Sequence, residues 1–63
     1  NTIDALINAL GAVVFATVRQ LPPAQQEAFA NDLARLAANA ERRGMTTDET
    51  ILIDLQNAAR AAV

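Results

Sequence analysis

Five residue types that often carry chemistry are missing from this 63-residue sequence: it has no Cys, His, Lys, Tyr or Trp. Without Cys there is no disulfide, and without Cys and His the usual ligands of a structural zinc site are absent. The usual general base, thiolate nucleophile and catalytic amine are absent as well. We therefore predict that the chain is not an enzyme and binds no metal or cofactor.

The remaining acidic residues fit a structural role better than a catalytic one. Asp48 and Glu49 form the only adjacent pair of carboxylates, and Asp54 follows nearby. Carboxylates in the first turn of a helix are stabilised by the helix dipole. A calcium loop requires several oxygen ligands around a turn glycine, a pattern that this segment lacks. We expect these acids to be solvated.

Basic residues are also scarce, since five arginines stand against seven acidic residues and the net charge is -2. Nucleic-acid surfaces are normally built from clustered Lys and Arg, so we expect no binding to nucleic acid. Arg42 and Arg43, which precede Gly44, are typical of the last turn of a helix.

Charge is entirely absent from one segment, residues 5–18, in which only Asn8 and Thr17 are polar. This apolar run is shorter than the ~20 residues of a membrane span and follows no basic region, so we expect neither membrane insertion nor a signal peptide. An interfacial helix would also need a basic face. These features favour a soluble, cytoplasmic protein.

As a helix, the uncharged run would be apolar on nearly every side and would require burial all round. The rest of a single domain comprising residues 1–63 can cover only part of it. Domains this small usually need a disulfide, a metal or an oligomeric contact, and the first two are unavailable to this chain. The sequence therefore predicts a homodimer or higher oligomer.

Three helices are predicted, over residues 2–20, 23–43 and 47–62. Thr2 is the expected N-cap of the first helix. The second is expected to begin at Pro22 or Pro23, because proline suits the first position of a helix. Gly44 should end it in a left-handed conformation.

The third helix carries the spacing of a capping box, in which Thr46 and Glu49 each satisfy a free backbone N–H group of the other. Because the turn before it is short, the last two helices should form an antiparallel hairpin packed on the hydrophobic first helix. The predicted fold is an all-α three-helix unit, completed as a helical bundle by dimerisation. Its inward residues are expected to be Ile3, Leu6, Ile7, Leu10, Val13, Val14, Thr17, Val18 and Leu21, then Phe29, Leu33, Leu36, Ala37 and Ala40, then Ile51, Leu55, Ala58 and Ala62.

A second apolar side of the first helix is predicted to meet the partner, because an exposed patch of that size favours aggregation in a monomer. Phe15 is the expected anchor, since aromatic residues carry much of the energy of interfaces. The function predicted is a non-catalytic protein–protein interaction module, an adaptor, inhibitor or regulator of a larger protein. The predicted interface residues are Ala5, Ala9, Ala12, Phe15, Ala16 and Ile53.

An alternative stays open at residues 12–20, where β-branched residues and Phe15 are compatible with a strand. With residues 18–23 and 41–51, this segment resembles the ribbon-helix-helix family of dimeric DNA-binding regulators. The resemblance covers residues 15–63 and implies that Phe15, Thr17 and Arg19 face the bases. Against it, the middle helix is about two turns longer than in that family, Gln20 lies between the strand and the prolines, and the charge is acidic.

Overall fold

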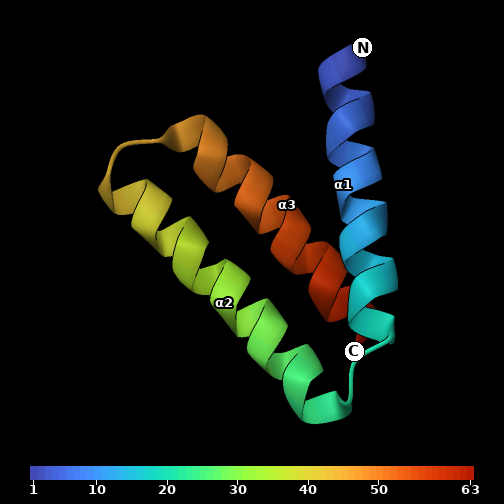
Figure 1. Ribbon diagram of the computed structural model, residues 1–63. Helices are drawn as coiled ribbons and strands as arrows, with labels where there is room; N and C mark the ends of the chain where they lie inside the picture. The colour runs from blue at the N-terminus through green and yellow to red at the C-terminus, as the bar shows by residue number, and fades with distance from the viewer.

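A computed structural model describes residues 1–63 and is all-α, with three helices: α1 (Thr2–Arg19), α2 (Pro23–Arg42) and α3 (Thr46–Ala62) (Figure 1). The three predicted helices are confirmed, with bounds that differ by at most one residue. Residues 12–19 lie in α1, so the alternative strand at residues 12–20 is wrong. The poor alternation of apolar and polar residues in this segment favours a helix over a strand.

The N-cap of α1 is Asn1 and not Thr2, which is the first helical residue. The Asn1 side-chain oxygen accepts a hydrogen bond of 3.0 Å from the backbone N–H of Asp4. Both Asn and Thr are good N-cap residues, and Asn is the stronger of the two. The predicted capping residue was therefore wrong by one position.

The connection from α1 to α2 is a short turn fixed by proline. Pro22 is extended, with φ -60° and ψ 154°, and Pro23 begins the helix as predicted. The side-chain amide of Gln26 donates a 3.0 Å hydrogen bond to the carbonyl of Val18. The same carbonyl accepts the backbone N–H of Leu21 at 3.0 Å, so the Gln26 bond adds a link from the end of α1 to α2.

Helix α2 ends in a Schellman motif. The N–H of Met45 donates to the carbonyl of Ala40 at 2.9 Å, and the N–H of Gly44 donates to that of Glu41 at 3.0 Å. Gly44 has φ +71°, a left-handed conformation that glycine adopts without steric cost. The predicted glycine cap is confirmed.

The capping box predicted at the start of α3 does not form. Met45 occupies the N-cap position without a side-chain cap, and Thr46 is already helical. The Schellman motif fixes Met45 directly after the turn, so α3 begins one residue earlier than a Thr46 cap would require. The N–H of Glu49 bonds to the carbonyl of Met45 at 2.9 Å.

The helices are arranged essentially in one layer, with α3 packed against α2 and α1 (Figure 1). The Cα positions span 33 × 28 × 11 Å, so the molecule is much thinner in one direction than in the other two. α2 and α3 form the predicted antiparallel hairpin. α1 joins it through its C-terminal half, whereas its N-terminal half stands apart from the α2–α3 turn.

A layer of this kind has a small core. Val18 of α1, Ala30 of α2 and Ala59 of α3 are fully buried together, and Ala37 and Ala40 are nearly so. Half-buried side chains surround the three central residues: Val14, Phe29, Leu33 and Ala62.

Most of the core stripe predicted on the first helix is exposed. The exposed fractions are 65% for Ile3, 59% for Leu6, 49% for Leu10 and 62% for Val13, and Leu36 of α2 is also exposed. The prediction that these residues lie in the core was wrong, because the α2–α3 hairpin covers only one side of α1. Of that stripe, Val18 is buried and Ile7, Val14 and Leu21 are half-buried.

The two glycines should respond in opposite ways to substitution by alanine. Gly44→Ala should lower the free energy of unfolding by about 1–2 kcal/mol, because a Cβ disfavours the left-handed conformation. Gly11→Ala should raise it by about 0.5–1 kcal/mol, because alanine favours the helix interior. A Cβ at Gly11 would lie 3.8 Å from that of Ala58, an ordinary contact. Urea denaturation at one protein concentration measures both, and destabilisation by Gly11→Ala would contradict this packing.

Candidate interaction surface

An exposed apolar surface lies on α1, next to the side of the helix that packs against α3. Gly11 faces Ala58 of α3, and Val18 lies in the core. These two residues therefore mark the side of α1 that touches the α2–α3 hairpin. At about 100° per residue, the exposed large side chains fall within an arc of about 80° beside that contact. Those side chains are Ile3, Leu6, Leu10 and Val13. We call them the α1 ridge.

The residues predicted from the sequence as an interface fall into three groups. Four alanines are exposed and continue the α1 ridge around the outer side of α1: Ala5, Ala9, Ala12 and Ala16. Phe15 is half-buried, and the Arg19 guanidinium lies 5.6 Å from the centre of its ring. Ile53 is exposed on α3. The structure thus gathers the alanines on one side of α1 and places Ile53 on another helix.

Sequence reasoning missed the α1 ridge as a site because it assigned those residues to the core. The signal was present in the width of the apolar stripe. Eight residues of one helix, and Leu21 just after it, were assigned to a core that only two alanine-rich helices could complete. A stripe this wide needs contacts on more than one side.

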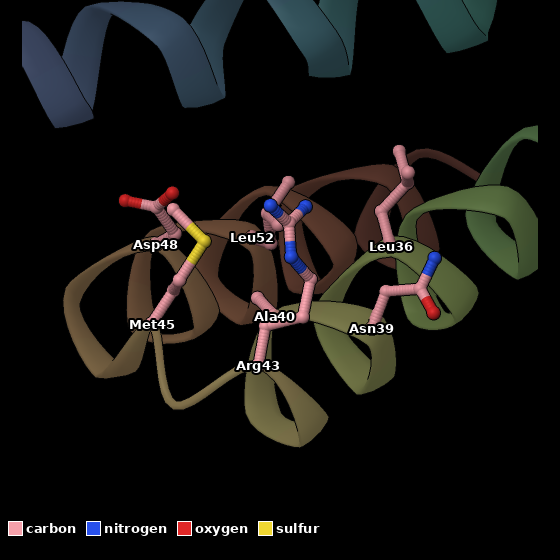
Figure 2. A pocket seen from close by; sticks show the side chains of 7 residues that line it. All are labelled: Leu36, Asn39, Ala40, Arg43, Met45, Asp48 and Leu52. Atoms are coloured by element: carbon pink, nitrogen blue, oxygen red, sulfur yellow. The ribbon is translucent and has the colours of Figure 1, made fainter.

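A hollow of about 240 Å³ lies between α2 and α3, near their turn. Its apolar lining comes from Leu36, Ala40, Met45 and Leu52, and its polar lining from Asn39, Arg43 and Asp48. Figure 2 shows the side chains of Leu36, Arg43 and Leu52 on the side of the hairpin on which α1 lies. The hollow stays open because α1 covers the other end of the hairpin (Figure 1).

Few ion pairs hold the molecule together. Asp32 and Arg35 form the predicted pair one turn apart on α2, and both are exposed. Arg60 donates a 3.2 Å hydrogen bond to Asn31, which links α3 to α2. Arg43, at the hollow, has no carboxylate within 4.0 Å. Its charge is therefore free to pair with a group from outside the chain.

Near the α2–α3 turn, the pKa of the Glu49 carboxyl is raised above its ordinary value. Partial desolvation is the main cause, and hydrogen bonding and repulsion from Glu41 add to it. A raised carboxyl pKa means that the folded chain holds this proton more tightly than the unfolded chain. The folded state therefore gains its full stabilisation at pH values below the pKa that Glu49 has in the unfolded chain. This stabilisation is lost as the pH rises through the pKa that Glu49 has in the folded chain.

By length and composition alone, α1 could also cross a membrane: it has 18 residues and a mean hydropathy of 1.4. The core helix of a soluble protein or a signal sequence meets the same criterion. α1 differs from such a core helix in that only Val18 is buried.

Comparison with known protein families, with characterised proteins and with solved structures finds no match for this chain.

The carboxyl pair at the turn can be tested by titration. Glu41→Gln should lower the pKa of Glu49, because it removes a neighbouring negative charge, but desolvation should keep that pKa above its ordinary value. Glu27→Gln makes the same change at the start of α2 and should leave the pKa of Glu49 unaltered. NMR titration of the Glu49 carboxyl carbon measures both. An unchanged pKa in Glu41→Gln would contradict the proximity of the two carboxyls.

Proposed function

We propose that the protein is a non-catalytic interaction module that self-associates through α1. The exposed apolar face of α1 supports this proposal, because it joins the α1 ridge to four exposed alanines without one charged side chain. Large exposed apolar patches mark sites of association in soluble proteins. The alanines would let a second helix backbone approach closely.

The surface area of the chain supports the same conclusion. A compact monomer of this mass exposes about 3,900 Å² by the size scaling of folded proteins. This chain exposes 4279 Å². The excess is what a single layer of helices leaves uncovered, since domains normally bury their apolar faces between two layers. A second layer would bring the ratio of surface to volume into the ordinary range.

A second copy of the chain is the partner that we propose for this face. In a two-fold dimer each copy presents the same surface, so an uncharged apolar face is its own complement. A dimer of such modules would then serve as an adaptor, inhibitor or regulator of a larger protein. We do not propose DNA binding, because the strand that it requires is helical here and the arginines are spread over three helices.

Substitutions on α1 should separate this proposal from a monomeric state. Leu6→Asp and Leu10→Asp should each abolish dimer formation at micromolar concentration, because each buries an unpaired carboxylate in the interface. Asn8→Asp adds the same charge outside the α1 ridge and should leave the dimer intact. Sedimentation equilibrium measures each association constant.

Three results would overturn the proposal. One is a wild-type chain that stays monomeric at all concentrations, and another is a dimer that survives both leucine substitutions. The third is partition of the wild-type chain into phosphatidylcholine vesicles in place of self-association. Phe15→Asp locates the interface further, since dissociation by this variant supports Phe15 as its anchor.

A further inference from the structure

The exposed side chains of the α1 ridge follow a spacing with which one helix packs against another. They are separated by three, four and three residues along the chain. This alternation places apolar side chains in one narrow line along a helix, as at the a and d positions of a coiled coil. Because all four are exposed, no helix of the same chain fills the spaces between them. Such a ridge is completed by a helix with the same spacing.

The charged residues of α1 lie away from this ridge. Asp4 and Arg19 are the two charged residues of the helix. At about 100° per residue, they fall roughly 140° and 160° around α1 from the middle of the ridge. A partner of either charge therefore gains no ion pair at the ridge, and an uncharged partner meets no unpaired charge.

The positions that flank the ridge are uncharged as well. Ile7 and Val14 lie on the side of the ridge toward the hairpin, and both are half-buried. Ala9 and Ala16 are exposed on the other side, where their small size lets a second backbone approach. Like charges at these flanking positions would keep identical helices apart. A second copy of α1 meets no such repulsion, and it has the matching spacing by identity.

The exposed area of the ridge is close to what a dimer requires. Each of the four side chains exposes between about half and two-thirds of its surface. Exposure of this extent leaves on the order of 100 Å² per side chain, so two copies would bury roughly 800 Å² through these residues alone. The flanking alanines add to this area. The total approaches the roughly 1,200 Å² at which specific interfaces of standard size begin.

Two ridges can pair in the same direction or in opposite directions, and the structure favours opposite directions. The next position in the spacing is Thr17, which is polar. A parallel pair places Thr17 of one chain against Thr17 of the other, whereas an antiparallel pair leaves it beyond the overlap of the two ridges. The hairpin packs on the C-terminal half of α1 (Figure 1). Antiparallel pairing therefore places the two hairpins at opposite ends of the seam, and it also brings helix ends of opposite partial charge together.

We infer that two copies pair their α1 ridges as a short antiparallel coiled-coil seam, with Leu6 of each chain opposite Leu10 of the other. Ile3 of each chain then lies opposite Val13. This inference rests on the proposed self-association and specifies its geometry. All four layers of the seam are aliphatic, and a two-fold axis crosses it between the two leucine layers. Phe15 lies about 160° around α1 from the middle of the ridge, outside the seam.

Disulfide cross-linking between single-cysteine variants tests the direction of the seam. Because the chain has no cysteine, Ile3→Cys and Val13→Cys can be made as separate proteins, mixed in equal amounts and oxidised in a glutathione buffer. The disulfide between the two variants should exceed the disulfides within each variant roughly tenfold, because identical positions lie about 15 Å apart along an antiparallel pair. A disulfide requires Cα atoms within about 7 Å of each other. Asn8→Cys lies on the far side of α1 and is the matched control, which should form little disulfide. Mass spectrometry of the intact products measures each species.

Aspartate substitutions give a second test that does not depend on disulfide geometry. Phe15→Asp should keep the dissociation constant within roughly threefold of wild type, because the side chain lies far from the seam. Leu10→Asp, on the ridge, should abolish the dimer. Sedimentation equilibrium measures both constants, and circular dichroism confirms that each variant is helical. A helical Phe15→Asp chain that stays monomeric would contradict the seam.

The outcomes distinguish the inference from the proposal on which it rests. If the wild-type chain dimerises but disulfides within each variant dominate, self-association stands and the antiparallel direction is wrong. If it dimerises and no mixture exceeds the Asn8→Cys control, the ridge is not the seam. If the wild-type chain does not associate, both are wrong. A dominant disulfide between Ile3→Cys and Val13→Cys supports both.

Discussion

The constraint on which this structure depends is that three helices arranged in essentially one layer cannot bury their apolar surface. Apart from the end of the hairpin where Val18 packs on Ala30 and Ala59, the helices meet only at their sides, so both faces of the layer stay exposed to solvent. Five residues are buried, and four of them are alanines, which contribute little apolar area each. The exposure of these leucines and isoleucines thus follows from the architecture, and a second layer would cover them.

The turns set this architecture because they decide where each helix stops. Pro22 and Pro23 end α1 and start α2, and Gly44 reverses the chain so that α3 returns along α2. Neither turn brings α1 across the whole hairpin. Val14 and Val18 of α1 therefore cover only one end of the groove between α2 and α3. The hollow beside Arg43, at the other end, stays open.

Sequence reasoning succeeded where local chemistry decides the outcome. The prolines and Gly44 determined the helix bounds, because proline restricts the backbone and glycine permits a left-handed residue regardless of the tertiary contacts. It failed where two local signals compete for one position. Asn1 is the N-cap of α1 in place of Thr2, and the Schellman motif excludes the capping box predicted at Thr46. Burial was harder still, because the helical pattern shows that Ile3, Leu6, Leu10 and Val13 need cover but not whether the same chain provides it. The hollow combines residues of α2, α3 and their turn, and no spacing in the sequence indicates that combination.

The concentration dependence of thermal unfolding shows whether a second copy completes this protomer, as we propose. If folding and association are linked, the unfolding midpoint followed by circular dichroism should rise on the order of 10 °C between roughly 1 μM and roughly 100 μM protein. The rise follows from mass action, since concentration favours the associated state that only the folded chains form. A midpoint that stays constant over this range would show that the single layer is stable by itself and that no second copy is needed.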